Sequence, residues 1–157
     1  MKLSAGAKWG ALTGLVFGLL SGVVGYLAVE SIKPQLLESM YRKIVESGTP
    51  PEVARQAVQL AAGNLGVWAL VGSVLGNLIV LTIVGLIMAA VWDRLKLPWY
   101  GKGAIFSLAL LLISVLPAVL VKTPNEPAPP AVFQAVGALL TFAGPLVLAW
   151  LLERRGG

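Results

Sequence analysis

Four long segments of the chain consist mostly of apolar residues and contain no charged residue. A helix needs about 20 consecutive apolar residues to cross the hydrocarbon layer of a membrane, and each segment approaches or exceeds this length. The pattern therefore predicts a bundle of four transmembrane helices. The expected spans are residues 9–29, 65–92, 103–121 and 131–152.

The segment between the first two expected spans, residues 30–64, is expected to form a helical loop on the extracytoplasmic side. Over residues 34–46 the apolar positions recur at helical spacing and polar residues fill the other face, which indicates an amphipathic helix. Gly48 is expected to end this helix. Its apolar stripe would lie on the lipid surface, cap the bundle or receive a partner.

A second short helix is expected after this turn. Residues 49–52, Thr-Pro-Pro-Glu, match a capping box in which Thr49 is the N-cap and Pro50 is the first helical residue. The helix would run to about Ala62. Together the two segments predict an amphipathic helical hairpin in the first outer loop.

The composition agrees with a membrane protein. The 157 residues are 57% hydrophobic and only 12% charged, whereas roughly 25% of the residues in a soluble domain are charged. We therefore predict an all-α membrane protein in which residues 1–157 form a single transmembrane domain.

Glycines recur at strict four-residue spacing through the first apolar segment. Small residues at this spacing let two helix backbones approach closely in lipid, where the hydrophobic effect does not drive helices together. The row therefore predicts a helix-packing interface and not a catalytic site. Its members are Gly6, Gly10, Gly14, Gly18 and Gly22.

Small residues on the second expected span form a matching patch. Gly72, Ser73 and Gly76 lie close together, and Gly85 and Ala89 lie farther toward the inner end. Two arrangements agree with this pattern. Either the first and second spans pack together within one chain, or the glycine faces join separate chains.

The polar side chains at membrane depth include no ionisable group, which argues against proton-coupled transport and ion pumping. Asn77 is the most costly of them to bury, because hydrocarbon cannot satisfy its amide. It would either make an interhelical hydrogen bond or, with Gln134, line a path for a solute. Gly144 beside Pro145 makes the fourth expected span a candidate hinge.

The chain contains no cysteine and no histidine. Disulfides, thiol catalysis, histidine-ligated haem, zinc sites and histidine proton relays are therefore excluded. The carboxylates outside the expected spans are scattered and form no catalytic constellation. We expect no catalytic residue, no metal ligand and no cofactor, and hence no enzyme.

Charge patterning predicts the orientation in the membrane. Seven basic residues flank the expected spans on one side, whereas the short loop on the other side has only Lys122, so both termini are expected in the cytoplasm of a multi-pass cell-membrane protein. The basic residues form no cluster with interleaved aromatics, which argues against nucleic acid. The seven are Lys2, Lys8, Arg94, Lys96, Lys102, Arg154 and Arg155.

These features favour a non-catalytic integral membrane protein that acts as an accessory or structural subunit of a membrane complex, or as a self-assembling scaffold. Its expected partners are the lipid bilayer and other membrane protein chains, in a homo- or hetero-oligomer. The alternative is a small oligomeric channel or transporter for an uncharged solute, built around Asn77, Gln134 and the bend at Pro145.

Overall fold

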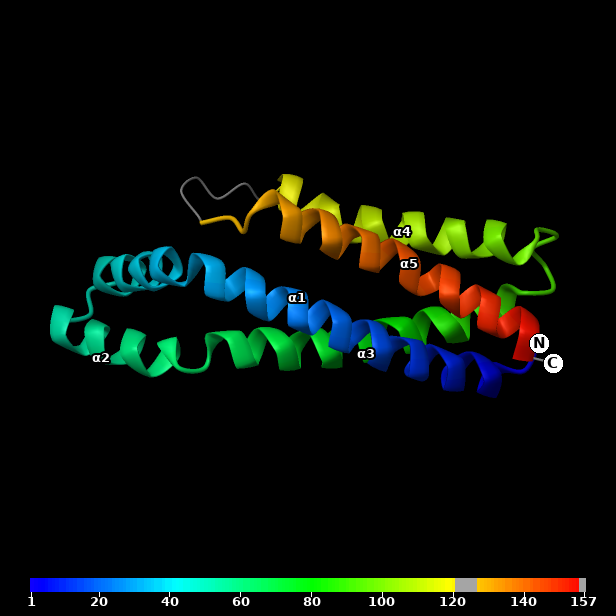
Figure 1. Ribbon diagram of the computed structural model, residues 1–157, viewed down its shortest axis with the longest axis horizontal. Coiled ribbons are helices and arrows are strands. Elements are labelled where there is room, and N and C mark those ends of the chain that lie inside the picture. The colour runs from blue at the N-terminus through cyan, green and yellow to red at the C-terminus, as the bar shows by residue number, and fades with distance from the viewer. Residues whose placement is uncertain (121–126, 156–157) are drawn as a thin grey trace.

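The computed structural model describes residues 1–120 and 127–155 of the chain, with the side chains of residues 115 and 117–120 excepted. All regular structure in this part of the chain is helical, which confirms the all-α part of the predicted fold class. The helices are α1 (Leu3–Glu46), α2 (Pro51–Ala62), α3 (Leu65–Val91), α4 (Trp99–Leu120) and α5 (Ala131–Arg155) (Figure 1).

Three of these helices, α1, α3 and α5, are long and apolar enough to cross a membrane. The apolar stretch of α4 that the structure describes, Trp99–Ser114, is shorter than a span. The expected end of the third span, residue 121, lies outside the described residues. The structure therefore supports a membrane protein with three candidate spans, and the fourth span stays a prediction.

α1 is a single helix of 44 residues, about 66 Å long at 1.5 Å per residue. This is about twice the thickness of a bilayer's hydrocarbon layer, about 30 Å. The expected break between the first span and the amphipathic helix that begins at Pro34 is wrong, because α1 continues through Pro34. A proline inside a helix bends it without always ending it, and residues 29–46 contain no glycine or asparagine that favours a stop.

α1 ends at Glu46, and Gly48 closes the helix as the sequence predicts. Gly48 has a φ of 92°, a left-handed conformation that glycine adopts at low cost. Its N–H donates to the Val45 carbonyl, and the Thr49 N–H donates to the Ile44 carbonyl. These two bonds form a Schellman motif, which satisfies carbonyl groups at the end of the helix.

The predicted capping box before α2 is wrong by one residue. Pro50 is the N-cap, Pro51 is the first helical residue, and no side chain caps the helix. The reason lies in the end of α1, because the Thr49 backbone already belongs to the motif that closes that helix. α2 contacts α1, where the Arg55 guanidinium lies 6.0 Å from the centre of the Tyr41 ring.

The four long helices form two pairs that meet mainly at one end. α1 packs antiparallel along α3, and α4 packs on α5. α5 joins the pairs through an extended contact with α1 and a shorter one with α3. Figure 1 shows the pairs close together near the two termini and apart toward the opposite end.

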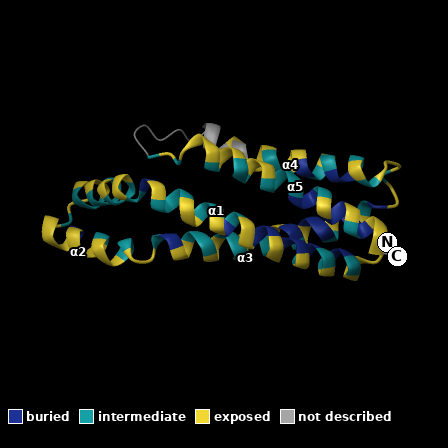
Figure 2. Ribbon diagram, in the orientation of Figure 1, coloured by how far each residue is buried: buried dark blue, intermediate teal, exposed yellow. Residues whose placement is uncertain are grey.

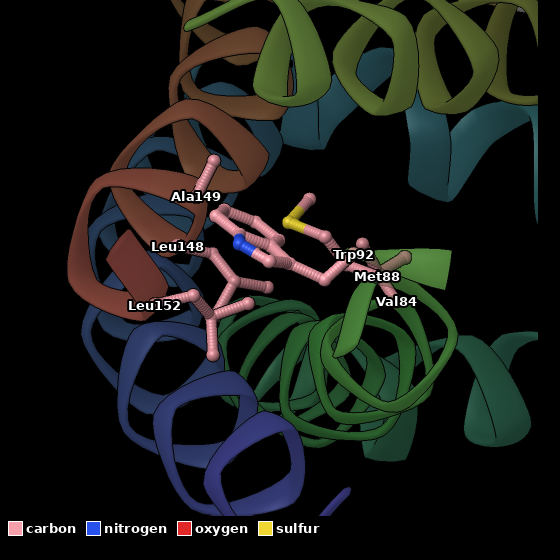
Figure 3. Packing of buried hydrophobic residues seen from close by; sticks show 6 residues of the cluster. All are labelled: Val84, Met88, Trp92, Leu148, Ala149 and Leu152. Carbon is pink, nitrogen blue, oxygen red and sulfur yellow. The ribbon is translucent and has the colours of Figure 1, made fainter. Parts of the chain in front are cut away.

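A compact apolar core fills the space between α3 and α5 at the end that carries the termini. Met88, Leu148 and Leu152 are fully buried there, and the Trp92 indole lies among them (Figure 3). Figure 2 shows that most buried segments lie in this half of the molecule. Many large apolar side chains elsewhere are exposed, as is expected for a surface that faces lipid.

Candidate functional site

The glycine row of α1 packs directly on the backbone of α3. A Cβ atom built on Gly10 would lie 2.5 Å from the Leu81 carbonyl oxygen, and one built on Gly14 would lie 2.7 Å from the Asn77 carbonyl oxygen. Both distances are shorter than Cβ contacts in proteins, so neither position has room for a larger residue. The row therefore faces a helix of its own chain. The same close approach occurs at Gly6 and Gly18, and the approach at Gly22 is slightly wider, 3.1 Å to the Leu70 carbonyl oxygen.

Gly72 and Gly76 lie outside this contact. Both are exposed, and no atom lies within 4 Å of a Cβ built on either of them. They therefore do not belong to the surface of α3 that meets α1, whereas Gly85 does lie against Gly6 and Gly10. That Gly72 and Gly76 join separate chains, the other arrangement that agrees with the sequence, stays a prediction. One glycine row already gives two helices room to approach, so α3 needs few glycines of its own along this contact.

A cavity of about 230 Å³ lies between α3 and the α4–α5 pair, where the two helix pairs separate. Its lining is largely aliphatic, and the cavity opens at the surface, because Gly76, Val80 and Ile113 at its edge are exposed. The lining residues are Gly76, Asn77, Val80 and Leu81 of α3, Leu110, Ile113 and Ser114 of α4, and Leu140, Thr141 and Gly144 of α5.

The polar side chains of this cavity donate hydrogen bonds within their own helices. The Asn77 amide donates to the Ser73 carbonyl at 2.9 Å, and the Thr141 hydroxyl donates to the Gly137 carbonyl at 3.0 Å. The Ser114 hydroxyl likewise donates to the carbonyl of Leu111. The expected hydrogen-bond partner of Asn77 lies on another helix. Its amide bonds within α3 instead, so the expected partner is wrong. Internal bonds of this kind let polar residues line an apolar cavity at low cost.

Gln134 lies away from Asn77 and does not line the cavity. It is exposed in the first turn of α5, and its amide donates to the Pro129 carbonyl at 2.8 Å. The structure therefore does not bring the two amides together in a joint polar site. The Gln134 amide instead bonds to backbone at the start of α5. A single sequence does not distinguish an amide with this structural role from one that lines a solute path.

Gly144 and Pro145 are both buried, and they lie where the packed core of α5 gives way to the cavity. A Cβ built on Gly144 would lie 3.2 Å from Leu81 Cδ1 and 3.8 Å from Phe17 Cγ. α5 remains helical through Pro145. The predicted hinge therefore lies at the boundary between the closed and the open parts of the bundle, which is where a bend of α5 would change the cavity.

The contact between α4 and α5 depends on two residues that the sequence analysis did not single out. The buried Ser107 hydroxyl donates to the Phe142 carbonyl, and a Cβ on Gly103 would lie 3.0 Å from Leu146 Cα. Gly103 and Ser107 are four residues apart. The spacing rule that identifies the glycine row of α1 also applies to this shorter pair.

The described residues contain no group of three or more carboxylates, cysteines or histidines that could hold a metal ion. The cavity itself has no ionisable side chain in its lining. Its chemistry is that of an apolar recess with an amide and two hydroxyl groups, which fits an aliphatic occupant. No known protein family, curated protein or solved structure shows significant similarity to this chain.

Proposed function

We propose that this protein is a non-catalytic integral membrane protein that acts by associating with other membrane chains, as an accessory subunit or a self-assembling scaffold. The observation that carries the proposal is the open cavity between α3 and the α4–α5 pair. Its walls are mainly aliphatic, and each of its three polar side chains donates a hydrogen bond within its own helix. A side chain of a partner helix fills such a recess by dispersion contacts alone.

In this proposal α1, α3, α4 and α5 all cross a cell membrane, and both termini lie in the cytoplasm. The excess of basic residues beside the termini supports this orientation. The outer third of α1 and α2 then form an amphipathic helical hairpin on the extracytoplasmic side. α2 contacts α1 and leads directly into α3, which supports this placement.

A channel or transporter for an uncharged solute is the second candidate, and the position of Asn77 favours it. Asn77 lines the cavity, and its bond to Ser73 uses only one of the two donors of an amide. An oligomer that places this recess around a shared axis would offer the remaining amide groups to a solute.

Two glycine substitutions on α3 test the association proposal. Gly76 lines the cavity and Gly72, one turn away on the same exposed face, does not. In Gly76→Leu the new side chain fills the recess, so we expect loss of partner chains or a smaller oligomer. Mass determination after purification in mild detergent measures this, with Gly72→Leu as the matched control.

The outcomes separate the alternatives. Loss of association in Gly76→Leu alone supports the cavity as the docking site, whereas loss in both variants indicates that the whole glycine face joins the chains. A wild-type protein that is monomeric and free of partners contradicts the proposal. Selective flux of a neutral solute into liposomes, abolished by Asn77→Leu, supports the channel instead.

A further inference from the structure

The basic residues gather at the end of the bundle that carries the termini. Seven basic and two acidic residues flank the helices there, whereas four of each lie along the outer part of α1 and on α2. The formal net charge of +5 is therefore concentrated at one end. One of the two acidic residues, Asp93, is already paired with the Met1 amine at 2.6 Å.

Two of these cations share one indole ring. The Lys8 ammonium lies 5.3 Å and the Arg155 guanidinium carbon 5.8 Å from the centre of the Trp9 ring. Lys8 and Trp9 are near the start of α1 and Arg155 is the last residue of α5, so two helices bring these charges together. Among the described residues, neither cation has a carboxylate partner within 4.0 Å.

At the opposite end of the molecule, two of the basic residues form ion pairs with carboxylates. Lys33 pairs with Glu30 at 2.9 Å, and Arg42 pairs with Glu38 at 2.9 Å. The contrast matters because two like charges near one ring repel each other, and an anion that attracts both of them offsets this repulsion. Among the residues that the structure describes, the Trp9 cluster, defined as Lys8, Trp9 and Arg155, therefore has no carboxylate partner of the kind that the other end supplies.

We infer that the Trp9 cluster binds the phosphate of an anionic phospholipid. Trp9 opens the long apolar stretch of α1, and indole rings prefer the headgroup level of a membrane. A phosphate at this depth accepts hydrogen bonds from both Lys8 and Arg155. The apolar sides of α1 below the cluster, where Leu12 and Val16 are exposed, lie against the acyl chains. This inference does not depend on the proposed function.

The test uses the full-length protein in detergent micelles, where membrane orientation plays no part. Binding of phosphatidylglycerol and of phosphatidylcholine with identical acyl chains is counted by native mass spectrometry. We expect wild type to prefer phosphatidylglycerol. The double variant K8Q/R155Q should lose about fivefold in affinity for each charge removed, or roughly twentyfold to thirtyfold in total.

The matched control is K33Q/R42Q, which removes one lysine and one arginine from the other end and should keep the preference. The charge-conserving exchange K8R/R155K should also keep it, which would show that the charges and not the particular side chains at these positions determine the preference. Equal losses in both double variants, or no preference in wild type, would overturn the inference. Displacement of phosphatidylglycerol by excess inorganic phosphate would show a soluble-anion site and also contradict it.

Discussion

The two glycine sets of this protein have opposite effects on packing. Along α1, Gly10 and Gly14 bring the backbone of α3 so close that a single added carbon has no room. On the other side of α3, Gly72 and Gly76 meet no neighbour, and Gly76 borders a cavity. A small residue therefore gives close contact only where another helix faces it, and otherwise leaves an open surface.

The largest expected effect is a substitution in the closed contact. In Gly14→Leu the new side chain would collide with backbone atoms of Asn77 and Leu78, which cannot move without separating the two helices. We expect a loss of stability of at least about 3 kcal/mol, the upper end for overpacked cores, measured by thermal denaturation in detergent. Gly72→Leu should change it little. A Gly14→Leu protein with wild-type melting would contradict the close contact.

The next effect concerns Leu81, which belongs both to the close contact between α1 and α3 and to the lining of the cavity. Its carbonyl oxygen faces Gly10 and its side chain lies against Gly144 at the edge of the cavity, and it is only 3% exposed. Leu81→Ala should cost about 2–5 kcal/mol, because it removes buried contacts and enlarges a space that does not collapse. Chemical denaturation measures this against Leu75→Ala on the exposed face, which should be close to neutral.

A stabilising substitution is expected at Thr13, a buried residue of α1 next to Gly14. Thr13 is 3% exposed, and its hydroxyl oxygen is buried without a hydrogen-bond partner among the described residues. Thr13→Val replaces this group with a methyl group of similar size, so the cost of burying an unsatisfied hydroxyl disappears. We expect a gain of about 1 kcal/mol in the same denaturation assay. A destabilised variant would show that the hydroxyl has a partner.

The smallest effect concerns pH at the end that carries the termini. The Met1 amine, through its hydrogen bond and its charge, and to a lesser extent Lys102, hold the pKa of Asp93 below its usual value. A carboxylate with a lowered pKa stabilises the folded state above the pKa of the unfolded chain, and this stabilisation is lost as the pH falls through the folded pKa. The difference in melting temperature between wild type and Asp93→Asn should therefore shrink below about pH 4. A constant difference between pH 7 and pH 3 would rule out this ion pair.

Helix positions could largely be predicted from the sequence, because apolar runs and glycine stops act locally. α2 and α3 begin within about two residues of their expected starts, and α1 ends at Glu46, directly before the turn at the expected glycine, Gly48. The failure at Pro34 has a physical reason. A proline removes one backbone hydrogen bond, and whether the helix ends there depends on how strongly the residues on both sides favour the helix.

The site was only partly predictable. The row on α1 was visible as a spacing, but its facing surface on α3 consists mainly of backbone atoms, which carry no sequence signal. The cavity depends on how far two helix pairs lie apart, and no local pattern reports that distance. The same limit applies to Asn77. Its amide donates to a carbonyl one turn earlier in its own helix, and the sequence looks the same whether the acceptor lies on this helix or on another.

The close contact between α1 and α3 can form only after both helices have been synthesised, which orders the steps of biosynthesis. Gly14 and Asn77, which meet in the folded protein, are separated by about 60 residues, which a ribosome adds in roughly 3–12 s at 5–20 residues per second. In the proposed membrane topology, α1 has no α3 to pack against during that interval and its glycine face lies toward lipid. The first 20 or so apolar residues of α1 would then insert as an independent helix, and pairing with α3 would follow as a separate, later event.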